Sequence, residues 1–224
     1  MSATRSLAQR DDADDDRRPM LRGVLHLITA ILAPVGLVTL ILLADSPRRY
    51  VGGAIFATTL ILLYASSAQY HLVPWSRRWH GVAKRVDHSM IFVLIAGSYT
   101  PFCLVVLSYA WGIPMLSVVW TLAGLGVLMV VAYPRAPRWL TTALYLALGW
   151  IAIVAIVPVV RSLDAAPLTM LAAGGAMYTL GALVYAMRRP DPFPRVFGFH
   201  EVFHVFVIAG SAIHFALVAA YVMR

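Results

Sequence analysis

Seven apolar runs occupy nearly all of the chain after residue 22, and they limit what this sequence can fold into. Each run is about 20 residues long, the length that an α-helix needs to cross the hydrocarbon core of a bilayer. Because little chain remains between the runs, the sequence predicts one all-α domain at residues 23–224, a seven-transmembrane helix bundle. The runs cover residues 23–44, 51–72, 86–107, 112–132, 139–160, 168–187 and 199–222.

Composition supports a membrane protein, because 61% of the residues are hydrophobic and only 12% are charged, against about 25% charged residues in a soluble domain. The first 22 residues are rich in Arg and Asp and are too polar to bury a core, so we expect a disordered tail. The apolar run that begins at Gly23 is too long for a cleavable signal sequence. The single cysteine, Cys103, excludes an intrachain disulfide and is interpreted as a small buried apolar residue.

The distribution of Arg and Lys predicts the orientation, because positive charge near helix ends is retained in the cytoplasm. Alternate loops are rich in these residues, which places the N-terminus inside and the C-terminus outside. The expected location of this multi-pass protein is the inner (plasma) membrane. The net charge of +8 is concentrated at segment ends, where it would anchor in anionic headgroups, so membrane lipids are the expected partners and no nucleic acid is. The loop residues are Arg77, Arg78, Lys84, Arg85, Arg135, Arg138, Arg188, Arg189 and Arg195. No oligomeric state is predicted.

Ionisable side chains mark one end of this bundle. His71, Asp87, His200 and His204 all fall at segment ends that the topology places on the cytoplasmic side. An ionisable group in hydrocarbon costs several kcal/mol, about 2.5–3.5 on insertion scales for charged residues, so such groups indicate a functional site. His200 and His204 are four residues apart and therefore share one helical face, and His71 would complete a three-histidine set. Three imidazoles with a fourth position left for water are typical of catalytic zinc.

Two further side chains fit the chemistry of such a site. Asp87 would supply compensating negative charge, hydrogen-bond the water at the metal, and accept or return a proton during hydrolysis. Zinc lowers the pKa of a bound water to about 7, which provides a nucleophile at neutral pH. Ser67 lies one helical turn from His71 and would orient a ligand or donate a hydrogen bond to a developing oxyanion.

Each of these residues also has a purely structural interpretation. The His200 and His204 pair is compatible with hydrogen bonds between helices rather than with a metal. Asp87 could pair with Lys84 or Arg85 at the interface, and Ser67 is a common packing residue.

Other polar residues are assigned structural positions. Glu201 is expected to face the headgroups or to pair with a loop arginine, and His26 and His88 to extend toward the interface. His214 lies on nearly the same helical face as His200 but about 21 Å further along the axis, so an interhelical hydrogen bond is expected there. Prolines inside the runs are candidates for kinks that open space for a cavity. They are Pro34, Pro101, Pro114 and Pro158.

In combination, these motifs resemble those of the bacterial hemolysin III family, within the progestin and adipoQ receptor superfamily. The motifs are Ser67-x-x-x-His71, Asp87-His88-Ser89, Ile95-Ala96-Gly97-Ser98-Tyr99-Thr100-Pro101 and His200-x-x-x-His204. The resemblance spans nearly the whole seven-helix region. It implies zinc bound by the residues at positions 71, 200 and 204, Asp87 in contact with the water at the metal, and Ser67 as the hydroxyl of the same site.

The resemblance extends in constellation to alkaline ceramidases, and adiponectin receptors are regarded as lipid amide hydrolases. Three functions therefore remain open. The first is a zinc-dependent intramembrane hydrolase of a lipid amide or ester. The second is a non-enzymatic protein of membrane homeostasis or ion handling that uses zinc structurally. The third is a hemolysin-type cytolytic protein.

Overall fold

The seven apolar runs form seven helical spans in a computed structural model that describes residues 19–223. All of these spans are long and apolar enough to cross a membrane, as predicted for a multi-pass membrane protein. Three spans have a change of helix type within them, so the bundle has more helical elements than spans. The elements are α2 (Val24–Leu43), α3 (Pro47–Leu72), α4 (Arg77–Pro101) with η1 (Phe102–Val106), α5 (Tyr109–Ala132), α6 (Arg138–Trp150) with η2 (Ile151–Ala155) and α7 (Ile156–Ser162), α8 (Ala165–Met187), and α9 (Phe199–Leu217) with η3 (Val218–Val222).

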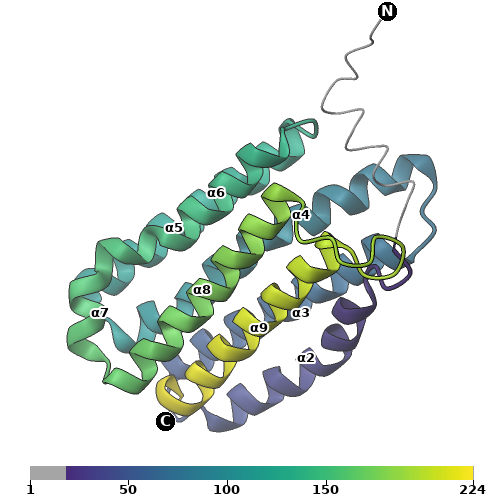
Figure 1. Cartoon of the computed structure of the whole chain (residues 1–224). Helices are drawn as coiled ribbons and strands as arrows, with labels where there is room; N and C mark the ends of the chain where they lie inside the picture. Colours follow the sequence, from purple (N-terminus) through teal and green to yellow (C-terminus); the bar gives the residue numbers. More distant parts are fainter. Residues whose placement is uncertain (1–18, 224) are drawn as a thin grey trace, which may run out of the picture.

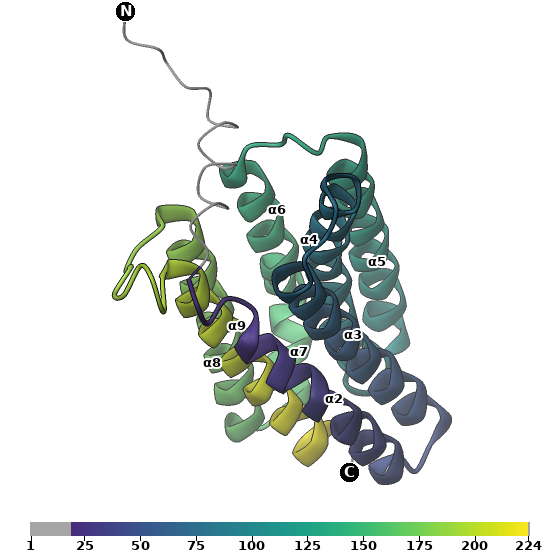
Figure 2. The same ribbon diagram turned by 90° about the vertical axis from the view of Figure 1, so that its right-hand side faces the viewer.

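The spans run side by side along one direction, so that alternate loops lie at opposite ends of the bundle (Figures 1 and 2). The most extensive packing joins α2 to α3, α3 to α4, α4 to α5 and α8 to α9, whereas α6 packs more loosely against α4, α5 and α8. The orientation in a bilayer remains the prediction made from loop charges.

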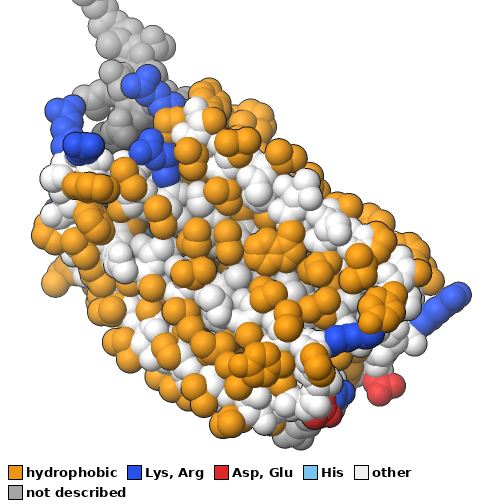
Figure 3. All heavy atoms as spheres, turned by 180° about the vertical axis from the view of Figure 1, so that it is seen from behind, with side chains coloured by type: hydrophobic (Ala, Val, Ile, Leu, Met, Phe, Trp, Pro, Cys, Tyr) orange, Lys and Arg blue, Asp and Glu red, His pale blue; other side chains and the backbone are white. Residues whose placement is uncertain are grey.

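Side chains turned outward are mostly hydrophobic, as expected where lipid replaces water as the solvent. Figure 3 shows one face of the bundle covered by hydrophobic side chains, with Lys and Arg confined to its two ends. Exposed large residues such as Leu42, Leu128 and Val154 belong to this outer surface. The apolar outward faces suit the hydrocarbon core of a bilayer, and the charged ends suit its boundaries with water.

Two buried clusters form the interior. Phe56, Tyr64 and Leu217 belong to the first cluster, between α2, α3, α4 and α9. Phe92 and Val119 belong to the second cluster, between α4, α5 and the α6–α7 span. Since both clusters include residues of α4, this helix holds the two halves of the bundle together.

Close approach of α3 and α4 depends on Gly97. A Cβ atom at this position would lie 2.2 Å from the Thr59 Oγ1 atom of α3. The two helices therefore pack at a distance that only glycine permits at residue 97.

Two differences from the predicted boundaries have physical reasons. The third span begins at Arg77 rather than at residue 86, because its polar first turns are helical before the apolar run starts. The fifth span is broken by the 3-10 turn η2, which lies in the turn before Pro158. Proline lacks an N–H and its ring clashes with the carbonyl four residues earlier, here that of Val154, so the α-helix is interrupted there.

Candidate metal centre

Three histidines come together at one end of the bundle, from two helices that are far apart in the sequence. His71 lies in the last turn of α3, and His200 and His204 lie in the first two turns of α9. One ring nitrogen from each histidine can be chosen so that all three atoms lie within 4.8 Å of one another. His71 and His204 are buried and His200 is half-buried.

The spacing of these nitrogens fits a metal ion. The Nε2 atoms of His71 and His200 are 3.2 Å apart. Two nitrogens that bind one tetrahedral zinc at 2.0–2.1 Å would be about 3.3 Å apart. Within residues 19–223, the cluster of metal-ligand side chains contains these three histidines and no fourth ligand, so one tetrahedral position would remain for a small molecule.

Asp87 and Ser67 belong to the lining of the cavity described below. Both are buried, with 7% and 2% of their surfaces exposed, and the Ser67 hydroxyl lies near enough to the Asp87 carboxyl group to interact with it. Both line the same cavity as His200 and His204. Ser67, Asp87, His200 and His204, four of the five residues that the sequence selected, thus line one cavity, and Asp87 is not among the three residues of the histidine cluster.

His26 is a site residue that sequence reasoning missed. It was expected to extend toward the interface, but only 3% of its surface is exposed, and its ring stacks on that of His204 with centroids 3.6 Å apart. The expectation was wrong because the first turn of α2 packs its His26 face onto α3 and α9. The sequence did contain one indication of its role. His26 lies in the first turns of its apolar run, at the same predicted end of the bundle as the other site histidines.

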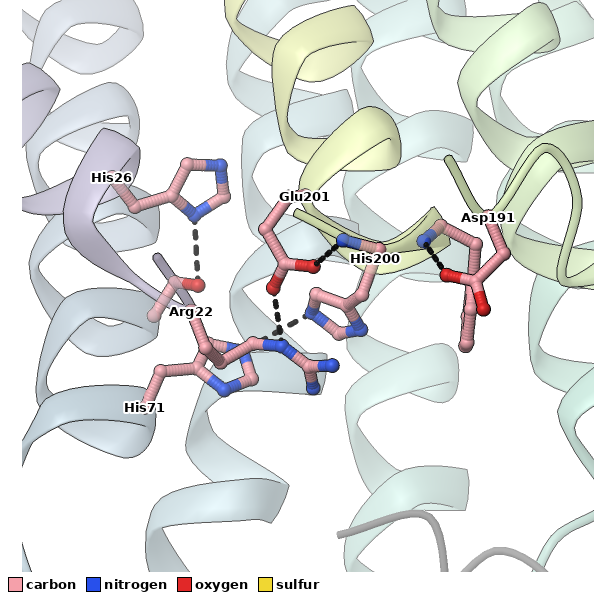
Figure 4. A network of polar contacts seen from close by, with 9 residues as sticks. Arg22, His26, His71, Asp191, His200 and Glu201 are labelled. Atoms are coloured by element: carbon pink, nitrogen blue, oxygen red, sulfur yellow. Dashed lines mark hydrogen bonds and ion pairs between the residues drawn. The ribbon is translucent and has the colours of Figure 1, made fainter. Parts of the chain in front are cut away.

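Glu201 anchors the first turn of α9, in which His200 lies. Its surface is 0% exposed, it accepts a hydrogen bond from the backbone N–H of Gly198, and it forms an ion pair with Arg22 (Figure 4). The predicted pairing with an arginine is thus confirmed, but the partner precedes α2 instead of lying in a loop. The headgroup-facing alternative is wrong, because the carboxylate is completely buried.

The chain before α2 lies across this end of the bundle. Met20 and Leu21 donate backbone hydrogen bonds to the carbonyls of Arg195 and Val196, in the connection between α8 and α9. Gly23 has φ 83°, and a Cβ there would lie 2.6 Å from the His71 Cβ atom. Residues 19–22 of the predicted tail are therefore ordered against the site, and residues 1–18 lie outside the described part of the chain.

A cavity of about 670 Å³ runs from the histidine end into the bundle. It extends from Asp87 and His200 at one end to Leu107 and Val159 toward the other, and most of its lining is apolar. Its lining includes exposed residues of the α6–η2 segment and of α8, namely Trp150, Ile153 and Leu180.

Three other expectations have clear outcomes. His214 makes the predicted interhelical hydrogen bond, from Nε2 to the Leu171 carbonyl at 3.4 Å. Cys103 is a free, buried cysteine. His88 is half-buried and lines the cavity, so its side chain faces into the bundle instead of extending toward the interface.

Comparison with known proteins identifies the relatives of this chain. Residues 16–215 match the family of haemolysin-III related proteins. The chain is 33% identical to the "Hemolysin-3 homolog" of Bacillus subtilis over 211 residues, covering 93% of this chain and 96% of the relative. It is 32% identical to "Hemolysin-3" of Bacillus cereus over 212 residues, covering 92% and 93%. It is also 27% identical to the "Adiponectin receptor protein" of Drosophila melanogaster over 191 residues, covering 76% of this chain and 42% of the relative.

Proposed function

The chain belongs to the haemolysin-III related family, and we propose that it is a zinc-dependent membrane hydrolase of a lipid amide or ester. The observation that carries the proposal is the convergence of His71, His200 and His204 at the end of an apolar cavity. A purely structural zinc site normally closes its coordination with four protein ligands. The cluster in the described chain offers three.

Each residue of the site would have its own role in the reaction. The three imidazoles would hold the metal, which when bound would activate a water molecule for attack on a carbonyl. Asp87 would take a proton from this water on its carboxylate and return it to the leaving amine or alcohol. Ser67 would donate a hydrogen bond to the Asp87 carboxylate near it and so orient this carboxylate toward the cavity end.

The cavity supports a lipid as substrate. Its volume of about 670 Å³ is within the range of pockets that bury small-molecule ligands, about 300–1,000 Å³. An acyl chain entering from the membrane between α6 and α8 would lie along the apolar lining, with its carbonyl at the histidine end. From the predicted orientation, the reacting end would be on the cytoplasmic side.

The two alternatives are less well supported by the geometry. An ion path along α9 beyond His214 would meet Leu217, Val218 and Val222, which are buried and apolar, with at most 1% of their surfaces exposed. Cytolysis is suggested by the name of the Bacillus cereus relative, Hemolysin-3. It predicts leakage of target vesicles that does not depend on Asp87, so it can be tested beside hydrolysis.

The first experiment is elemental analysis of detergent-purified protein, with folding checked by circular dichroism. We expect near one zinc per chain in the wild type and in Asp87→Ala, and loss of zinc in His71→Ala and His204→Ala. His80→Ala is the matched control, since His80 lies outside the three-histidine cluster.

The second experiment tests turnover with fluorescent ceramide and ester lipids in mixed micelles. Asp87→Ala should keep its zinc and lose activity by about 10²–10⁴-fold, the usual contribution of a general acid–base group. Hydrolysis that survives in Asp87→Ala, or absence of zinc from well-folded wild type after resupply, would contradict the proposal. Vesicle leakage without lipid cleavage would favour cytolysis instead.

A further inference from the structure

His26 has more contacts with the site than burial alone requires. Its ring lies nearly parallel to that of His204, with an angle of 15° between the planes. Its Nδ1 atom is 2.8 Å from the Ser67 Oγ atom, and its ring meets that of Tyr64 edge-on at 5.0 Å. One side chain of α2 therefore contacts a candidate metal ligand on α9 and the hydroxyl group on α3 that supports Asp87.

The direction of the hydrogen bonds follows from simple chemistry. An ionised Asp87 can only accept, and the Ser67 hydroxyl near it has a single hydrogen, which it would donate to the carboxylate. The Ser67 oxygen then accepts a hydrogen bond from His26, so the imidazole carries its hydrogen on Nδ1. The result is a directed chain from His26 through Ser67 to Asp87.

The second ring nitrogen of His26, Nε2, indicates that the imidazole has a role beyond filling space. His26 Nε2 is buried and has no hydrogen-bond partner within the described residues. A phenyl ring would fill the same space and stack on His204 without leaving a buried acceptor unpaired. Packing alone therefore does not account for histidine here, whereas a hydrogen-bond donor to Ser67 does.

From these contacts we propose that His26 is a positioning residue of the site, a role that rests on the proposed hydrolase function. Its Nδ1–H group fixes the Ser67 hydroxyl toward Asp87, and its ring face fixes the orientation of the His204 imidazole. The first contact acts on the reaction rate through Asp87. The second acts on metal affinity through His204.

Because the two contacts use different parts of the side chain, two substitutions separate them. His26→Phe keeps a ring to stack on His204 and loses the donor. His26→Asn keeps an amide N–H near the position of Nδ1 and loses the ring. His26→Ala loses both, and His80→Phe is a control outside the cluster.

The two readouts are zinc affinity, from competition with a chromophoric chelator, and kcat for lipid hydrolysis at saturating zinc. Zinc affinity should be unchanged in His26→Phe and should fall about 10-fold or more in His26→Asn and His26→Ala, as for loss of other groups that orient metal ligands. For kcat the expected order of His26→Phe and His26→Asn is reversed. The kcat of His26→Asn should be near that of wild type, whereas the kcat of His26→Phe and of His26→Ala should be reduced at least 10-fold. KM should change little in all three variants.

The crossed order distinguishes positioning from general stability, because a loss of folding would lower both quantities in the same order. The double variant His26→Phe/Ser67→Ala should be no slower than Ser67→Ala, since both changes break one chain of hydrogen bonds. Equal zinc affinity in wild type, His26→Phe and His26→Ala would overturn the role at His204, and an additive double variant would overturn the role at Ser67. If wild type binds zinc but cleaves no lipid, the proposed function fails while the zinc series still decides whether His26 positions His204.

Discussion

The ion pairs Arg22–Glu201 and Asp45–Arg49 both have a nitrogen–oxygen distance of 2.5 Å, but their surroundings differ. The Glu201 side chain is 1% exposed, whereas that of Asp45 is 66% exposed. Removing one partner of a buried pair leaves an uncompensated charge, at a cost of about 3–5 kcal/mol. An exposed pair is screened by water and contributes little.

We therefore expect Glu201→Gln to lower the thermal unfolding midpoint in detergent strongly, and Asp45→Asn to leave it nearly unchanged. Circular dichroism against temperature measures both variants under one set of conditions. Equal shifts would mean that Arg22 finds water or another partner when Glu201 loses its charge.

Some residues of the candidate site could be predicted from the sequence, and His26 could not. His200 and His204 are linked by their four-residue spacing, and His71 and Asp87 by their position at the predicted cytoplasmic ends of segments. His26 has no comparable spacing signal, because it is a single histidine in a helix that is apolar on all sides. Which face of α2 turns toward α3 and α9 is decided by packing, and only the structure shows it.

At the scale of the elements, the seven spans were predictable because a membrane sets their length and requires apolar side chains. The places where the helices are interrupted were harder to predict. Pro158 indicated a kink, but the sequence did not indicate how the chain replaces the lost hydrogen bonds. In the structure, the Tyr99 hydroxyl of α4 donates to the Gly149 carbonyl at 2.5 Å and accepts from the Ala152 N–H at 2.9 Å.

Tyr99→Phe should therefore destabilise the break between α6 and η2. The phenyl ring keeps the packing, but two backbone groups lose a partner, at about 1–3 kcal/mol for each group left unsatisfied. The unfolding midpoint should fall, and amide hydrogen exchange should increase over residues 149–155. Tyr133→Phe is the control, because Tyr133 is 52% exposed. Equal behaviour of the two variants would show that water replaces the Tyr99 hydroxyl.

At the scale of the whole molecule, the cavity results from an uneven distribution of packing. The α8–α9 and α3–α4 pairs pack extensively, whereas α6 is loosely held between α4, α5 and α8. The apolar runs predicted seven helices in a bundle. They gave no information on which neighbouring helices would pack loosely, because every run is apolar. The cavity thus depends on a balance among interhelical contacts that a single sequence does not reveal.

Two glycines allow this cavity to be tested without disturbing the packed interfaces. A Cβ atom at Gly175 or at Gly124 would have no neighbour within 4 Å. Gly175 lines the cavity, whereas Gly124 lies on the exposed side of α5. Phenylalanine at position 175 should therefore occupy the space in which we expect an acyl chain, while phenylalanine at position 124 should extend into the surrounding lipid.

The expected result is that Gly175→Phe lowers the amount of lipid that copurifies with the protein, measured by native mass spectrometry, and raises KM for a lipid substrate at least 10-fold. Its zinc content should equal that of wild type, because Gly175 is not among the residues that could bind the metal. Gly124→Phe should match wild type in lipid, KM and zinc. If both variants retain full lipid and activity, the cavity does not hold the acyl chain, and the carbonyl must reach the three histidines from another side of the bundle.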